Sequence, residues 1–226
     1  MISLRHVFGQ QVRREWLLQV REPRSVLFSA LFFAMVIVFF PLTISPDPAL
    51  LRQLAPGVFW IALLLALLMA SERLFQDDFN DGVIEQWLVS GIPVCILVLA
   101  KLTVHSVLNL LPILILSVLL GALFDLSLSE RGVVVLSFIL ATPAILFLAA
   151  LAAAFCTSMQ QKGVLIALIL LPLVIPVMIF GSGALSAAMQ QLSVMGYFAI
   201  LLALSILAIA FLPFATAAII RISLTD

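Results

Sequence analysis

Five of the eleven carboxylate residues of this chain are concentrated in one stretch, Ser71–Pro93, which reads SERLFQDDFNDGVIEQWLVSGIP. They are Glu72, Asp77, Asp78, Asp81 and Glu85. A dense set of acids in one stretch suits contact with the surface of another protein. Because the apolar runs on either side are long enough to cross a bilayer, we interpret the stretch as an inter-helix loop in water. We expect a soluble subunit to bind it.

His105 is an ionisable residue within an apolar run. Imidazole is a common axial ligand of heme iron, and Lys101 lies one turn earlier on the same helical face. The alternative is a histidine hydrogen-bonded to a neighbouring helix, which we favour because no second ligand or heme-binding motif accompanies it. We expect the Lys101 ammonium to extend along its flexible stem to the lipid headgroups.

Several signatures of catalysis are missing from the sequence. No G-x-x-x-x-G-K-[ST] phosphate loop occurs, so we do not expect this chain to hydrolyse ATP, and no H-E-x-x-H is found. No carboxylate pair lies in the middle of an apolar run, where proton-coupled carriers place theirs. Cys95 and Cys156 lack the spacing of metal ligands. We therefore predict no catalytic, metal-binding or cofactor-binding residue.

The composition indicates that membrane helices position these groups. Hydrophobic residues make up 65% of the chain and charged residues 10%, whereas about 25% of a soluble domain is charged. Runs of about 20 apolar residues predict an all-α, polytopic membrane protein with one domain, residues 1–226. Prolines inside the runs are compatible with helices if neighbouring helices satisfy the freed carbonyl groups. The six expected spans are Ser25–Ile44, Pro56–Phe75, Leu99–Leu120, Gly132–Phe155, Gly163–Gly183 and Val194–Ile219.

The basic residues predict the orientation of these spans. If the spans alternate, nine of the eleven basic residues fall on one side and only Arg52 and Arg131 on the other. Positive charge is enriched in cytoplasmic loops, so we expect both termini and Ser71–Pro93 to be cytoplasmic. With a net charge of zero and no basic patch, the chain gives no indication of a nucleic-acid partner.

The N-terminal segment has apolar residues at every fourth position with arginines between them. This pattern is typical of an amphipathic helix that lies in the membrane interface, with its arginines toward lipid phosphates. An ordinary basic flank that only enforces topology is the alternative. The apolar positions are Leu4, Phe8, Val12, Trp16 and Val20.

Within the acidic loop, the sequence predicts one short helix. Asp81 is a candidate N-cap and Gly91 a candidate C′ residue, with Pro93 just beyond it. Such a short helix must pack on something to be stable. Either a partner covers its apolar face, or the loop is solvated and this face folds back on the membrane surface. The apolar face comprises Val83, Ile84, Trp87 and Leu88.

The chain resembles the CcmB family over nearly its whole length. CcmB proteins are permease subunits of the bacterial Ccm system, which matures c-type cytochromes. Glu72–Gln86 is the most specific block, and its place after the second span agrees with the family. The blocks that carry the resemblance are FPLTISPDPALLRQLAPGVFW (Phe40–Trp60), ERLFQDDFNDGVIEQ (Glu72–Gln86), LPLVIPVMIF (Leu171–Phe180) and LPFATAAIIRIS (Leu212–Ser223).

The resemblance implies a six-span ABC-transporter permease in the bacterial inner membrane. It would work in heme export with the CcmA ATPase and with CcmC and CcmD. A competing account makes the subunit a scaffold, in which ATP hydrolysis releases the heme-loaded chaperone CcmE from CcmC and no heme passes through CcmB. A pore or secondary carrier would instead need a polar path through the spans, for which the sequence offers few residues.

The resemblance and the loop pattern meet at Ser71–Pro93. A permease without its own ATPase must receive motion through a cytoplasmic element, and related ABC permeases use a coupling helix there. Combining this with the helical spacing, we predict that the following residues dock the ATPase subunit: Asp77, Asp78, Asp81, Val83, Ile84, Glu85 and Trp87.

Overall fold

The computed structural model describes residues 4–44, 47–72, 74–156 and 162–222, and these residues are helical with short connections. In chain order the elements are α1 (Leu4–Arg21), α2 (Arg24–Thr43), α3 (Pro48–Ser71), α4 (Gln76–Asn80), α5 (Val83–Val89), α6 (Val94–Leu120), the 3-10 turn η1 (Gly121–Phe124), α7 (Leu128–Phe155), α8 (Lys162–Met189) and α9 (Met195–Ile222).

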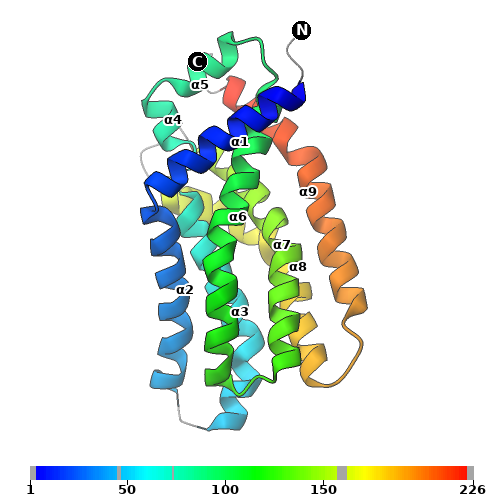
Figure 1. The fold of residues 1–226 in the computed structure, drawn as a ribbon. Helices are drawn as coiled ribbons and strands as arrows, with labels where there is room; N and C mark the ends of the chain where they lie inside the picture. Colours follow the sequence, from blue (N-terminus) through cyan, green and yellow to red (C-terminus); the bar gives the residue numbers. More distant parts are fainter. Residues whose placement is uncertain (1–3, 45–46, 73, 157–161, 223–226) are drawn as a thin grey trace.

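Six long helices, α2, α3, α6, α7, α8 and α9, run along one axis and form a bundle (Figure 1). Each is long and apolar enough to cross a membrane, which confirms the six expected spans as helices. α1 lies across one end of this bundle, where α4, α5 and the last turns of α9 also lie (Figure 1). We call this the charged end. Several helices are longer than expected, and α3 begins at Pro48 because Asp47 accepts a hydrogen bond from the Ala49 N–H and caps it.

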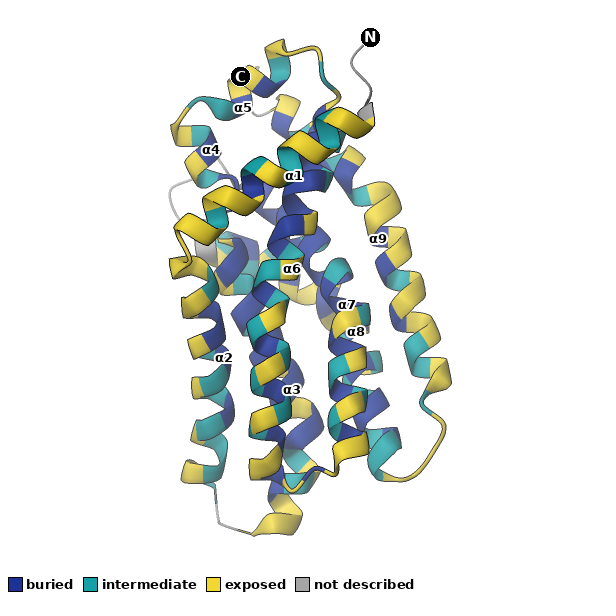
Figure 2. Ribbon diagram, viewed as in Figure 1, coloured by how far each residue is buried: buried dark blue, intermediate teal, exposed yellow. Residues whose placement is uncertain are grey.

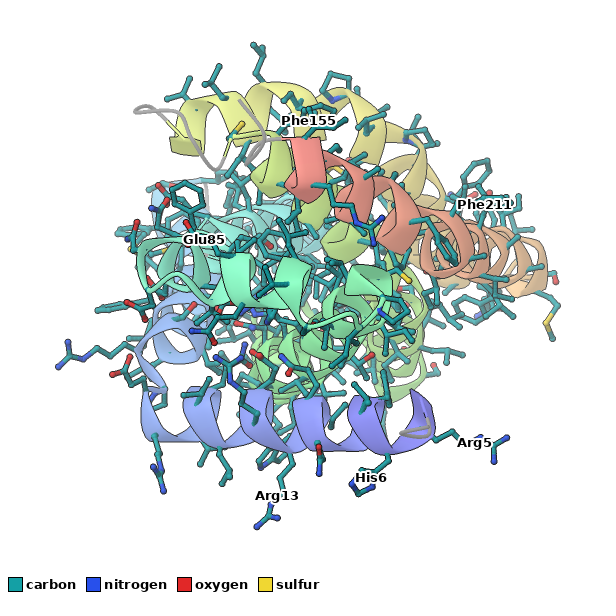
Figure 3. The ribbon with its side chains drawn as sticks, turned by 90° about the horizontal axis from the view of Figure 1, so that it is seen from above. Arg5, His6, Arg13, Glu85, Phe155 and Phe211 are labelled. Carbon is teal, nitrogen blue, oxygen red and sulfur yellow. The ribbon has the colours of Figure 1, made fainter. Side chains whose placement is uncertain are left out.

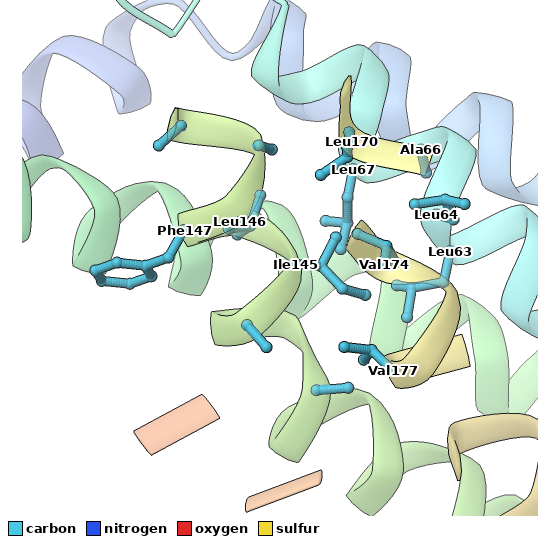
Figure 4. Close-up of a cluster of buried hydrophobic side chains, with 14 of the residues drawn as sticks. Leu63, Leu64, Ala66, Leu67, Ile145, Leu146, Phe147, Leu170, Val174 and Val177 are labelled. Atoms are coloured by element: carbon cyan, nitrogen blue, oxygen red, sulfur yellow. The ribbon is translucent and has the colours of Figure 1, made fainter. Parts of the chain in front are cut away.

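The bundle has two inner helices and four outer ones. α3 and α7 bury most of their apolar windows, whereas α2, α6, α8 and α9 leave most of theirs half-buried or exposed (Figure 2). Leu63 and Leu67 of α3, Ile145 of α7, and Val174 and Val177 of α8 pack together between these helices (Figure 4). Exposed apolar surface on so many outer helices is what a lipid environment requires and a water-soluble protein avoids. The chain is a multi-pass membrane protein.

The helix α7 shows how an internal proline is tolerated. Pro143 has no N–H to donate, and the adjoining turn is completed from α9. The Ser205 hydroxyl donates to the Leu140 carbonyl and accepts from the Ala144 N–H at 3.2 Å. A neighbouring helix thus satisfies backbone groups near the proline, as the sequence led us to expect.

Close contact between α3 and α8 depends on a residue without a side chain. A Cβ atom added at Gly181 would lie 1.9 Å from Cζ2 of Trp60, which is fully buried. We expect Gly181→Ala to destabilise the bundle by about 1–3 kcal/mol, because the indole must move within a packed core. Thermal unfolding in detergent would measure this. Gly57→Ala is the matched control, since nothing lies within 4 Å of its added Cβ; equal losses for both variants would contradict the prediction.

The other end of the bundle is fixed by an arginine. The Arg52 guanidinium is 2.5 Å from Glu130 Oε1 and also donates to the Asp125 carbonyl oxygen. Glu130 and Ser127 form a reciprocal capping box at the start of α7. These contacts hold the beginning of α3 against the η1–α7 connection.

Candidate functional site

The acidic loop contains two short helices in place of the single one expected. The Asp81 N–H donates to the Asp77 carbonyl oxygen and closes α4. Gly82 then adopts a left-handed conformation, with φ +69°, before α5 begins. Asp81 as the N-cap is therefore wrong: it ends α4, and Gly82 provides the turn, since a glycine has no Cβ to oppose positive φ. Gly91, with φ +71°, confirms the expected C′ position.

The apolar face of α5 points into the protein. Ile84 and Trp87 are buried, Val83 and Leu88 are half-buried, and α5 packs against α6. Ile84 and Trp87 belong to the same apolar cluster as residues at the start of α6. This chain's own helices cover Ile84 and Trp87, and direct contact of these two residues with a partner stays a prediction. Their role is to hold the loop on the bundle.

The outer surface of the loop is acidic. Asp77, Asp81 and Glu85 are exposed, as is Glu72 where α3 ends. Glu85 belongs to the charged end, which Figure 3 shows from above. We call Asp77, Asp81 and Glu85 the acidic face. Buried apolar residues anchor the other side of the loop. The three carboxylates of the acidic face are therefore held in fixed positions on the surface.

Asp78 does not belong to the acidic face, because it is buried and forms ion pairs inside the protein. Its Oδ2 atom lies 2.5 Å from Lys101 Nζ, and its Oδ1 atom lies 3.7 Å from an Arg14 nitrogen. Glu15 completes the set, at 3.3 Å from Lys101 Nζ and 2.8 Å from Arg14. We call Arg14, Glu15, Asp78 and Lys101 the ionic cluster. Two cations and two carboxylates from α1, α4 and α6 neutralise one another.

The ionic cluster corrects one expectation and bears on another. Lys101 does not extend to lipid headgroups: it is buried and bonded to two carboxylates. The Asp78 carboxylate is buried and paired within the chain, so it is not part of the exposed acidic surface, and its contact with a partner stays a prediction. The sequence carried a signal for this pairing, since a lysine in an apolar helix needs a partner and Glu15 directly follows two arginines in a basic segment. Only the fold could select that partner.

His105 lies one turn along α6 from Lys101 and joins a second polar network. Gln19 Nε2 on α1 and Asn109 Nδ2 lie 3.1 and 3.2 Å from its Nδ1 atom. The Asn109 amide nitrogen also donates to the His105 carbonyl oxygen, and its oxygen lies 3.2 Å from the Ser29 hydroxyl. The Nδ1 side of the His105 ring thus lies between the side-chain amides of Gln19 and Asn109. This confirms the hydrogen bond to a neighbouring helix; whether heme iron is ligated stays a prediction.

α1 is a helix, as expected. The residues on its side facing the bundle differ from those on its exposed side. Gln11 and Glu15 turn toward the protein and are hydrogen-bonded to each other at 2.7 Å. Trp16 and Val20 are exposed, and the labelled Arg5 and Arg13 point away from the bundle (Figure 3). α1 thus contacts the bundle through polar residues and Val7, whereas Trp16 and Val20 are exposed and able to face lipid.

Together these features define a multi-pass helical membrane protein that presents an anchored acidic loop at one end. Residues 6–223 match the family described as "CcmB protein". The chain belongs to the CcmB family, which confirms the resemblance seen in the sequence.

Similar proteins span almost the same length as this chain. Heme exporter protein B of Pseudomonas aeruginosa is 41% identical over 98% of this chain and 99% of its own. The protein of the same name from Haemophilus influenzae is 39% identical, over 97% and 100%. That of Escherichia coli K12 is 41% identical, over 96% and 99%.

Proposed function

We propose that this chain is the permease subunit of an ABC transporter that delivers heme to the periplasm for c-type cytochrome biogenesis. Membership of the CcmB family supports this function, together with six candidate spans and relatives named for heme export. The chain carries no phosphate loop, so a separate ATPase, CcmA, supplies the energy. CcmC and CcmD are the further partners, and CcmE would act through the complex.

The proposal includes an orientation in the bacterial inner membrane. The charged end faces the cytoplasm with both chain termini, because most arginines and lysines belong to that side. α1 lies in the membrane interface, with exposed Trp16 and Val20 toward lipid and Arg13 toward headgroup phosphates. Under the alternative, in which this segment is only a basic flank, substitutions at Trp16 would be without effect.

The acidic face is the docking surface for the ATPase subunit. The observation that carries this proposal is that Asp77, Asp81 and Glu85 are exposed on a loop whose buried side is fixed by Ile84 and Trp87. A flexible loop would deform when the ATPase subunit moved against it. An anchored loop would transmit that movement to α6. Of the predicted docking residues, we retain Asp77, Asp81 and Glu85 as direct contacts, with Val83 at the edge. Asp78, Ile84 and Trp87 hold this surface in place.

The test is a double charge reversal, Asp81→Lys with Glu85→Lys. We expect about a tenfold weaker association with the ATPase subunit, because like charges meet where opposite ones were matched. Copurification from membranes would measure it across a salt series, and the parent's association should weaken as salt rises because exposed charges are screened.

Glu22→Lys is the control for this reversal, as an exposed acid at the same end but outside the loop. If the double variant bound the ATPase subunit as strongly as the parent does, the acidic face would not be the docking surface. Normal recruitment and hydrolysis without heme transport by the parent would instead favour the scaffold that releases CcmE from CcmC.

A further inference from the structure

The ionic cluster is the place where the acidic loop is joined to the rest of the protein by charge. Asp78 belongs to α4, the helix whose exposed side carries Asp77. Lys101 belongs to α6, and Arg14 and Glu15 to α1. One ammonium group, on Lys101, contacts both carboxylates, at 2.5 and 3.3 Å. A short helix of the loop, a helix across the bundle end and a long bundle helix therefore share one set of bonds.

This junction continues into the bundle through the second polar network. Gln19 lies one turn from Glu15 on α1 and bonds to His105, one turn from Lys101 on α6. Asn109 follows on the same face of α6 and bonds to Ser29 of α2. Hydrogen bonds and ion pairs thus connect α4 with α1, α6 and α2.

Such a junction is sensitive to small movements. The Asp78 carboxylate joins α4 directly to Lys101, so a displacement of α4 by about 1 Å would stretch this bond beyond hydrogen-bond length or carry α6 along. Apolar packing at Trp87 is less directional. Buried ion pairs add little net stability compared with apolar residues of the same size. Their advantage lies in fixing one geometry.

We infer that Arg14, Glu15, Asp78 and Lys101 are positioning residues that transmit ATPase-driven movement of the acidic loop to α6 and α1. The inference rests on the proposed function. None of these four residues is assigned to direct contact with the ATPase; they act through the loop that contacts it. Substitutions in the cluster should therefore affect the transmission of ATPase-driven movement and leave recruitment of the ATPase intact.

The test replaces one ion pair of the cluster by apolar residues, in the double variant Lys101→Met with Asp78→Leu. This change keeps charge balanced, because Arg14 and Glu15 remain paired at 2.8 Å, and balanced replacement spares the fold. We expect copurification with the ATPase within about twofold of the parent, and continued ATP hydrolysis. Cytochrome c yield per hydrolysed ATP should fall about five- to tenfold, the size expected of lost coupling along such a path.

Two further variants sharpen the result. Lys101→Arg keeps the positive charge and several hydrogen-bond donors, and we expect it to keep most of the parent's cytochrome c yield per hydrolysed ATP. Arg52→Met with Glu130→Gln removes the ion pair at the other end of the bundle, and it should leave the yield within about twofold of the parent because it is outside this path. An equal fall in yield in that control would overturn the inference, because the loss of any ion pair would then have the same effect.

Parental coupling in the Lys101→Met, Asp78→Leu variant would also overturn the inference. If that variant failed to fold, Arg14→Gln would decide, because Arg14 is partly exposed and its loss should be tolerated. We expect a severalfold lower yield from Arg14→Gln, and an unchanged yield would count against the cluster. If the parent itself recruited no ATPase, the proposed function would fail instead.

Discussion

Lys101→Met alone should produce one of the largest losses of stability of any single substitution in this chain. The buried carboxylates of Glu15 and Asp78 would remain with Arg14 as their only cation among the described residues. Breaking a buried ion pair from one side costs about 3–5 kcal/mol, because it leaves an uncompensated charge. The apparent unfolding temperature in detergent would measure the loss, with the amount of chain in the membrane as a second readout.

The double variant with Asp78→Leu is the control for this prediction. Removing both partners leaves no excess charge, so we expect it to recover most of the lost stability. Lys101→Arg should also be milder than Lys101→Met. If Lys101→Met unfolded at the parental temperature, the lysine would have to be solvated in the membrane, and the paired geometry would not describe the protein there.

Trp87→Ala is expected to be nearly as damaging, although the indole lies outside the long bundle helices. Trp87 is 6% exposed and belongs to the core cluster. Truncating a buried tryptophan costs about 3–5 kcal/mol through lost burial and the cavity left behind. The loop should detach from α6, so that limited proteolysis cuts within Ser71–Pro93 faster than in the parent. Recruitment of the ATPase should fall as a consequence.

Val89→Ala is the matched control on the same helix, because Val89 is 85% exposed. We expect a change within about 0.5 kcal/mol and parental resistance to proteolysis. Salt distinguishes the two ways of losing the partner: the effect of Trp87→Ala should persist at high salt, whereas an effect carried by the acidic face is screened. Intact recruitment with Trp87→Ala would show that α5 does not hold the docking surface.

These variants assign different tasks to neighbouring residues of one loop. In the proposed function, Trp87 holds the loop in place, Asp81 and Glu85 contact the ATPase subunit, and Asp78 transmits the movement. An exporter and a scaffold that releases CcmE both require this division, because both convert ATP hydrolysis into movement of this subunit. They differ only in whether heme crosses the bundle, and a transport assay on the reconstituted complex would separate them.

The sequence by itself determined the architecture. Long apolar runs can cross a bilayer only as helices, because no water is available there for unpaired backbone groups. The six runs therefore predicted six helices, and all of them are present. The concentration of acids in Ser71–Pro93 marked the loop, and the block Glu72–Gln86 pointed to the CcmB family. Each of these signals depends on composition or local order, which a sequence records directly.

Only the tertiary structure decided which way the loop faces and which charges pair. The spacing of Ile84 and Trp87 showed that α5 has an apolar face, but periodicity does not say whether a partner or the chain's own α6 covers it. Lys101 needed a partner, and local order could not select Glu15 and Asp78. Both are distant from it in sequence and reach it only when α1 and α4 pack beside α6 at the charged end. Burial and ion pairing depend on contacts between elements far apart in the chain, and the packed bundle alone sets these.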